Sequence, residues 1–166
     1  MFKKIGDFQK TWGYESAATE KLFGNLTDEA LGQKVTEDGR SLGFLAWHIV
    51  TTMNEMFGHA GLEIDAPGPE TSVPENASEI LAAYKKGAES ILKVVAENWS
   101  DEELGDEIPM YGEKWPKSGV LYALIAHEGH HRGQMTVLMR QAGLRVPGIY
   151  GPAKEEWEQM GMPAMA

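Results

Sequence analysis

The sequence of 166 residues contains no cysteine and no long apolar run. The lack of cysteine excludes structural disulfides, cysteine-ligated zinc sites and a cysteine nucleophile. No window approaches the roughly 18 consecutive apolar residues that a membrane-spanning helix needs. The N-terminal stretch MFKKIGDFQKTW also lacks the apolar core of a signal peptide. We therefore expect a cytoplasmic protein that does not enter a membrane.

Basic residues are few and scattered. The chain has 15 Lys and Arg against 25 Asp and Glu, and its formal net charge is −10. Because nucleic acids are bound through clustered basic side chains, this balance argues against a nucleic-acid partner. With 42% hydrophobic and 24% charged residues, the composition is that of a folded globular protein. The length predicts a single domain over residues 1–166.

Apolar residues recur with helical spacing in four long segments. These segments cover approximately residues 6–24, 41–60, 76–98 and 118–142. Ser41 and Ser118 are placed to cap the second and fourth segments. The long polar connectors are rich in Gly and Pro, and AKEEWEQM near the C-terminus predicts a short further helix. The sequence therefore predicts an all-α fold, a four-helix bundle with long loops.

Three of the five histidines lie close together in the stretch IAHEGHHRGQM, residues 125–135. The inward-facing stripe of this segment reads Val120, Leu124, His127, His131, Met135, Leu138 and Ala142. His127 and His131 thus occupy interior positions and stack roughly 6 Å apart along the helix axis. This spacing lets two imidazoles bind one metal ion. His130 projects to one side of the pair.

A polar stripe on the second segment offers further ligands. It consists of His48, Thr52, Glu55 and His59. His48 and His59 lie about 16 Å apart along a helix, so they cannot bind the same ion. His48 lies among large apolar residues and is the better candidate. Three neutral imidazoles are typical of a catalytic site with an open coordination position. A fourth ligand such as Glu55 would instead indicate a structural ion.

The neighbours of the histidines suggest further roles. Gln134 projects toward the His127 face and could hydrogen-bond a ligand or substrate. Arg132 could pair with an acidic substrate or, within the chain, with Glu128 or Glu55. His127 to His131 also spells H-E-x-x-H, in which Glu128 would be the general base of a metallohydrolase. The longer protease pattern fails at Gln134 and Val137, and no strands precede the motif.

The stretch HEGHHRGQM resembles the fourth-helix signature of the DinB/YfiT-like family of metal-binding four-helix bundles. LAWHIV resembles the single-histidine element of that family, and GIYGP resembles its C-terminal Tyr-Gly-Pro. The resemblance extends over nearly the whole chain. It implies up-down-down-up packing, a homodimer, and a divalent transition metal (Zn, Ni or Fe) held by His48, His127 and His131.

Characterised members of this family include bacillithiol S-transferases and a mycothiol-dependent maleylpyruvate isomerase. The resemblance therefore implies a metal-dependent transferase or related detoxification enzyme, with a small-molecule substrate and a low-molecular-weight thiol as co-substrate. A cation favours thiolate over thiol, which makes a nucleophile at neutral pH. Glu128 and Gln134 are the candidate catalytic groups. Two alternatives stay open: a non-enzymatic, stress-related metal-binding bundle and, less favoured, the H-E-x-x-H metallohydrolase.

Overall fold

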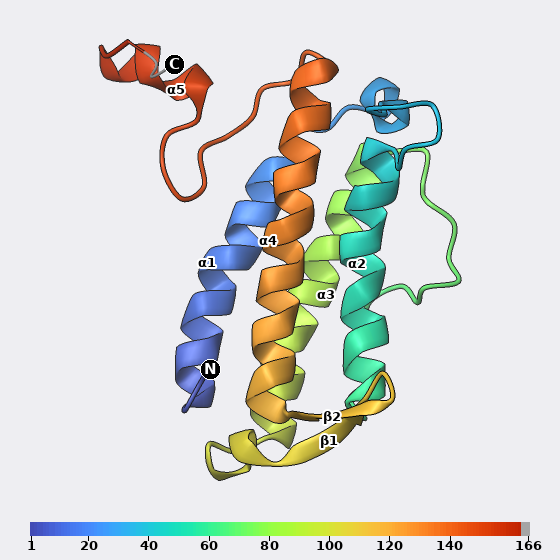
Figure 1. The fold of residues 1–166 in the computed structure, drawn as a ribbon, viewed down its shortest axis with the longest axis vertical. Helices are drawn as coiled ribbons and strands as arrows, with labels where there is room; N and C mark the ends of the chain where they lie inside the picture. Colours follow the sequence, from blue (N-terminus) through green and yellow to red (C-terminus); the bar gives the residue numbers. More distant parts are fainter. Residues whose placement is uncertain (164–166) are drawn as a thin grey trace.

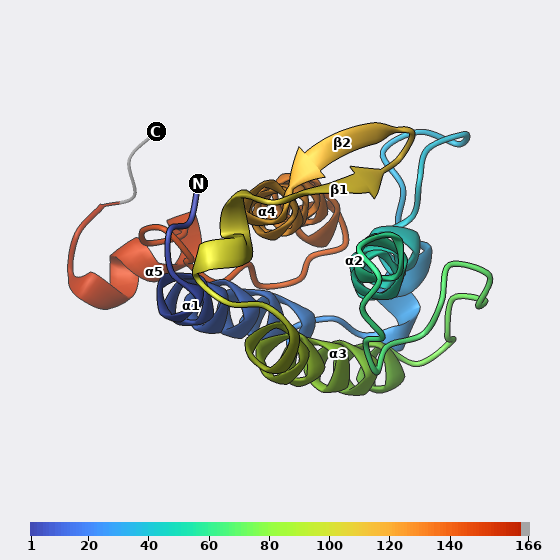
Figure 2. The same cartoon turned by 90° about the horizontal axis from the view of Figure 1, so that it is seen from below.

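Four long helices and a two-stranded hairpin make up most of the computed structural model, which describes residues 1–163 (Figures 1 and 2). The long helices are α1 (Ile5–Phe23), α2 (Leu42–His59), α3 (Ala77–Asn98) and α4 (Lys117–Gln141). The shorter elements are η1 (Asp28–Gly32), η2 (Glu102–Gly105), β1 (Glu107–Met110), β2 (Glu113–Pro116), α5 (Lys154–Trp157) and η3 (Glu158–Met160).

The helices are arranged up-down-down-up. Figure 1 shows α1 and α4 running in one direction and α2 and α3 in the other. Helix α2 packs against α3 and α4, and α1 packs against the same two helices. The parallel pair α2 and α3 requires a long crossover, which the connector of residues 60–76 provides. The predicted four-helix bundle is confirmed, and α5 is the predicted short C-terminal helix.

The core lies where the apolar stripes of the four helices meet. Fully buried members include Phe8, Trp12, Ile49, Met53, Ile80, Tyr84, Ile91, Leu124 and Met135. Each such side chain stabilises the fold by about 1.5–3 kcal/mol when it leaves water. The buried indole N–H of Trp12 donates to the carbonyl of Ala88 at 3.0 Å, so this polar group is also satisfied.

The residues at the helix ends are those that the sequence predicted, with one exception. Ser41 caps α2 as predicted, because its Oγ accepts from the N–H of Phe44 at 3.1 Å. Gly143, with φ of +73°, lies just beyond the end of α4, also as predicted. The prediction that Ser118 caps α4 was wrong. Pro116 ends strand β2 and is itself the residue before the helix, so Ser118 already lies inside the first turn.

The connector before α4 contains a β-hairpin that the sequence indicated only as a short extended stretch. Strand β1 pairs antiparallel with β2, with Glu107 opposite Pro116 and Met110 opposite Glu113. Tyr111 and Gly112, both with positive φ, make the two-residue turn. Strand β1 contacts α2 and β2 contacts α4, so the hairpin lies across one end of this helix pair (Figure 2).

None of the helices in residues 1–163 combines the length and the apolar character that crossing a membrane requires.

Candidate metal centre

Three histidines come together between α2 and α4. His48 comes from the middle of α2, and His127 and His131 come from successive turns of α4. The ring centroids are 4.4 Å apart for His127 and His131, 5.0 Å for His48 and His127, and 4.8 Å for His48 and His131. One ring nitrogen from each residue lies within 4.8 Å of the other two. This group could hold a metal ion.

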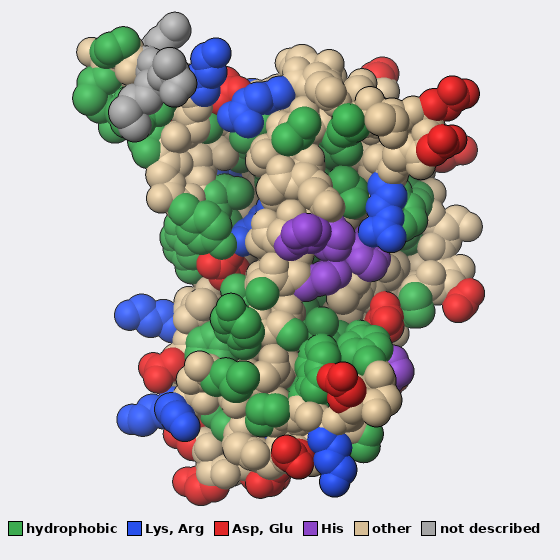
Figure 3. All heavy atoms as spheres, in the orientation of Figure 1, with side chains coloured by type: hydrophobic (Ala, Val, Ile, Leu, Met, Phe, Trp, Pro, Cys, Tyr) green, Lys and Arg blue, Asp and Glu red, His purple; other side chains and the backbone are tan. Residues whose placement is uncertain are grey.

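The histidine group is accessible from outside. His131 is 5% exposed, whereas His48 and His127 are half-buried. Figure 3 shows histidine side chains reaching the surface in the middle of the face formed by α2 and α4. Within residues 1–163 the group comprises these three imidazoles and no carboxylate, so Glu55 does not close it. Three protein donors with an open side are the arrangement of catalytic rather than structural sites.

The electrostatic environment keeps the imidazoles neutral. Burial, together with the charges of the neighbouring histidines, lowers the pKa of His127 to about 4. Burial also lowers the pKa of His48 and of His131, and the Arg40 guanidinium acts in the same sense on both. A neutral imidazole offers the lone pair that a cation needs. The donor set therefore fits a divalent transition metal.

Gln134 fixes the orientation of one ring. Its Oε1 lies 2.7 Å from Nδ1 of His131, and because an amide oxygen can only accept, Nδ1–H is the donor. This leaves the lone pair on Nε2, which lies 3.1 Å from Nε2 of His127. The predicted hydrogen bond of Gln134 to a candidate ligand is therefore present. Such partners hold ligand rings in one tautomer.

Two pockets flank the histidine group along α2. One, of about 320 Å³, is lined by His48 and His127 together with Glu55, Tyr111, Trp115 and Ala123. The other, of about 370 Å³, is lined by Gln134 with Val35, Arg40, Leu45, Val137 and Leu138. A small molecule could reach His48 and His127 from the first pocket, whereas the second meets the group only through Gln134, the partner of His131. Tyr111 and Arg40 were missed by sequence reasoning, because both lie in connectors, where helical spacing does not indicate which side chains face the group.

Glu128 lies on the other side of α4. It is 1% exposed, and its Oε2 accepts from the hydroxyls of Thr19 at 2.9 Å and Tyr84 at 3.0 Å. These partners belong to α1 and α3, so the structure does not bring Glu128 to the histidine group. The general base of an H-E-x-x-H site would have to face the metal. Burial raises the pKa of Glu128 to about 7.

Arg132 is paired, but with neither of the two predicted partners. It forms an ion pair with Glu15 and donates to the Glu15 carbonyl at 2.8 Å. It also donates to the hydroxyl of Tyr150 at 2.7 Å, and that hydroxyl donates to the Glu15 carboxylate. Tyr150 is the tyrosine of GIYGP, so this motif gave a signal for the contact. Glu15 gave none.

The remaining two histidines are not among the three grouped ligands. The His59 ring lies 4.6 Å from the ring of Tyr111 and is near the end of α2. His130 is exposed, and its ring packs edge-on to that of His131 at 4.9 Å. The choice of His48 over His59 agrees with the grouping in the structure.

Comparison with known proteins identifies the family. The sequence model of the DinB family matches residues 1–163. The chain belongs to the DinB family. It is 43% identical over 164 residues to the uncharacterized protein YrdA of Bacillus subtilis (strain 168), covering 99% of this chain and 98% of that protein.

Solved structures agree with this assignment. A DinB-like protein from Bacillus cereus ATCC 10987 superimposes with a TM-score of 0.87 at 39% identity, covering 90% of this chain and all of that one. A second DinB-like protein, YjoA from Bacillus subtilis, gives a TM-score of 0.64 at 21% identity over 82% of this chain and 92% of that one, and so supports the fold alone.

Proposed function

We propose that this DinB family protein is a divalent-metal-dependent enzyme that transfers a low-molecular-weight thiol to an electrophilic small molecule. The observation that carries the proposal is the group of three neutral imidazoles, open on one side and flanked by pockets. A Zn, Ni or Fe ion held by His48, His127 and His131 would favour thiolate over thiol at neutral pH.

The chain's own residues have distinct roles in this proposal. His127 and His131 present their Nε2 atoms from one face of α4, and Gln134 holds the His131 ring in the required tautomer. His48 completes the donor set from α2. Because the sequence has no cysteine, the sulfur nucleophile has to come from a co-substrate. The pockets on either side of the group offer space for that thiol and for the electrophile.

The reaction is a substitution at carbon. The thiol releases its proton to solvent, and a sulfur lone pair forms the new S–C bond. The leaving group departs with the electron pair of the bond that breaks. The protein's contribution is to hold both reactants beside the histidine group, which removes much of the entropic cost of their encounter.

The test uses 1-chloro-2,4-dinitrobenzene, whose chloride is the leaving group, with cysteine, cysteamine and 2-mercaptoethanol as thiols. We expect thiol-dependent turnover above the uncatalysed rate in protein loaded with Zn, Ni or Fe, and its loss in His48→Ala. Gln141→Ala is the control, because this exposed residue lies at the end of α4, outside the group and both pockets. Equal turnover in metal-free protein or in His48→Ala would contradict the proposal.

The same experiment separates the non-enzymatic alternative. Stoichiometric metal binding without turnover for any thiol would favour the non-enzymatic metal-binding bundle. The metallohydrolase is not proposed, because Glu128 does not face the histidine group. Its carboxylate instead accepts hydrogen bonds from Thr19 of α1 and Tyr84 of α3.

A further inference from the structure

The pocket on the hairpin side of the histidine group combines aromatic rings with a carboxylate. Tyr111 comes from the hairpin turn and Trp115 from β2, and their rings lie 5.8 Å apart. The Tyr111 ring also packs against His59 at 4.6 Å. Glu55, half-buried on α2, supplies a carboxylate to the same pocket. Aromatic faces and a carboxylate therefore surround a space that opens onto His48 and His127.

The backbone conformation of Tyr111 indicates a functional role for its side chain. Tyr111 has φ of +49°, in the left-handed region. It is the first of the two turn residues, a position that favours Asn, Asp or Gly because they tolerate positive φ. A large side chain held in such a conformation at a pocket wall is typical of a functional position. The turn therefore places an aromatic ring beside the histidine group at some cost in backbone strain.

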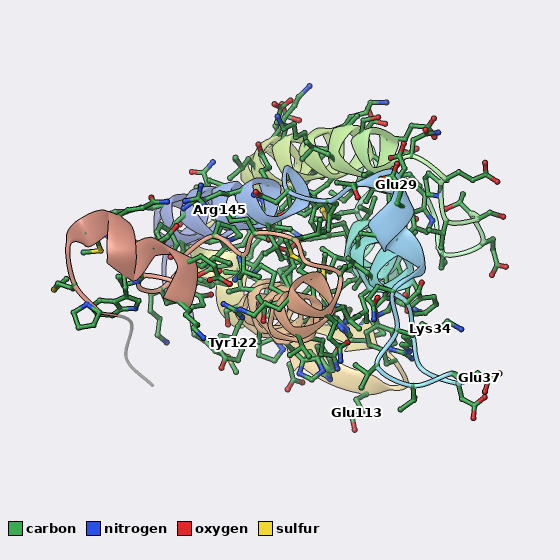
Figure 4. All side chains as sticks on the ribbon, turned by 90° about the horizontal axis from the view of Figure 1, so that it is seen from above. Glu29, Lys34, Glu37, Glu113, Tyr122 and Arg145 are labelled. Atoms are coloured by element: carbon green, nitrogen blue, oxygen red, sulfur yellow. The ribbon has the colours of Figure 1, made fainter. Side chains whose placement is uncertain are left out.

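The charges around the pocket are negative. Within residues 1–163 Glu55 forms no ion pair with a Lys or Arg, and neither residue type lines this pocket. Glu113 adds a second carboxylate, which accepts from the indole N–H of Trp115 at 3.1 Å. Figure 4 shows Glu113 at the outer edge of the molecule, which leaves Glu55 as the carboxylate of the pocket itself.

Arg40, whose charge acts on His48 and His131, lies in the opposite direction. Arg40 precedes the first turn of α2, whereas Glu55 lies two turns beyond His48. Arg40 lines the other pocket, with Gln134 and Leu138. A cation at the histidine group is therefore drawn toward the hairpin and repelled from the Arg40 side. Aromatic rings and a carboxylate are the groups with which proteins bind an ammonium ion.

We propose that the pocket formed by Glu55, Tyr111 and Trp115 binds an ammonium group of the thiol co-substrate, so that the site selects amino-thiols. The carboxylate of Glu55 is the charged partner, and the faces of Tyr111 and Trp115 pack against the ammonium and its neighbouring methylenes. The thiol part of this statement rests on the proposed function, whereas the ammonium site rests on the pocket alone.

The first experiment compares matched thiols on zinc-loaded protein by calorimetry. The pairs are cysteamine with 2-mercaptoethanol, and 6-amino-1-hexanethiol with 6-mercapto-1-hexanol, so that two chain lengths are sampled. We expect one amine to bind at least about tenfold more tightly than its alcohol. In Glu55→Gln this preference should fall below about threefold. Glu97→Gln, an exposed residue of α3 with the same change in charge, should keep it.

The second experiment needs no metal and no thiol. Butylammonium is added to metal-free protein, and the indole N–H resonance of Trp115 is followed by NMR, with n-butanol as the uncharged control. We expect a saturable shift with butylammonium alone, and its loss in Glu55→Gln.

The outcomes separate the two proposals. If none of the four thiols binds zinc-loaded protein, the proposed thiol chemistry is overturned, and the butylammonium titration still decides the ammonium site. If the alcohols bind as tightly as the amines, or if Glu55→Gln responds to butylammonium like the wild type, the ammonium site is overturned while the proposed function stands.

Discussion

Two pairs of polar residues on α4 stand one position apart in the sequence and differ in which segments they contact. His127 and His131 face α2, are partly accessible, and direct ring nitrogens at each other at 3.1 Å. Glu128 and Arg132 face α1 and α3 and are only 1% and 2% exposed. Both pairs have the i, i+4 spacing of a single helix face.

The two pairs differ in where their hydrogen bonds go. Arg132 and Glu128 are bonded to Glu15, Thr19, Tyr84 and Tyr150, so they tie α4 to α1, α3 and the C-terminal segment. Such a network stabilises the bundle because its loss would leave buried polar groups unpaired. The histidines converge on a common point. Unpartnered atoms occur in both pairs: within the described residues Nδ1 of His127, Oε1 of Glu128 and Nε of Arg132 have no hydrogen-bond partner. The two pairs are therefore distinguished by geometry: Glu128 and Arg132 bond to residues of other segments, whereas the two histidines direct ring nitrogens at a point that His48 also reaches.

The largest expected change in stability comes from breaking the network of Glu128 and Arg132. Arg132→Met should destabilise the metal-free protein by about 3–5 kcal/mol, because the carboxylate of Glu15 stays buried without its partner. Arg140→Met on the same helix removes the exposed pair with Glu155 and should change stability by less than about 1 kcal/mol. Urea unfolding of both variants measures the difference. Equal losses would mean that the buried network does not hold the bundle together.

The second-largest expected effect is a fall in stability with rising pH. Burial raises the pKa of Glu128 from its ordinary value of 4.5 to about 7. The folded protein therefore binds this proton more tightly than the unfolded chain, and its stability falls as pH rises from about 4.5 to about 7. Relative to Glu128→Gln, metal-free wild type should lose up to about 3 kcal/mol across that window. Urea titrations at several pH values would refute this if the two proteins gave parallel pH profiles.

A smaller effect is expected at the histidine group. Gln134→Ala removes the acceptor for Nδ1–H of His131, and should lower zinc affinity about 10- to 100-fold. Because Gln134 is exposed, the stability of metal-free protein should stay the same. Gln141→Ala, an exposed glutamine at the end of the same helix, is the control. A competition titration with a chromophoric chelator measures both, and unchanged affinity in Gln134→Ala would remove this residue from the site.

The smallest effect is at the hairpin. Tyr111→Asn replaces a strained residue by one that favours the left-handed conformation, and should stabilise the protein by about 1 kcal/mol. The same variant should lose part of the preference for amino-thiols, so stability and binding would change in opposite directions. Thermal unfolding and calorimetry on one preparation test both. A variant that is less stable than the wild type would show that Tyr111 serves packing.

The sequence predicted what depends on local spacing. The stripe from Val120 to Ala142 assigned His127 and His131 to the bundle interior, because neighbours on a helix face lie three or four positions apart. The distance between His48 and His59 along one helix likewise showed that the two cannot bind the same ion. Ser41 as a cap and Gly143 at the end of α4 likewise depend on chemistry within a few residues.

Contacts between distant segments could not be predicted in the same way. Glu15 meets Arg132 across 117 positions, and Tyr84 meets Glu128 across 44. Helical phase alone left Arg132 with the wrong partners, because it shows which face a residue occupies and not which helix covers that face. The hairpin could not be predicted from the sequence for another reason: Tyr-Gly is a weak turn signal compared with Asn-Gly. The ammonium pocket follows from that turn and so was not foreseen.

The most direct test of the account is the metal content of protein purified without chelator and without a histidine tag, beside a His127→Ala/His131→Ala double variant. We predict about one transition-metal ion per chain in the wild type, and none in a double variant that remains folded because its Glu128 and Arg132 network is intact. A wild type that takes up no Zn, Ni or Fe when each is supplied, or a double variant that keeps its ion, would contradict the assignment of this histidine group as a metal centre.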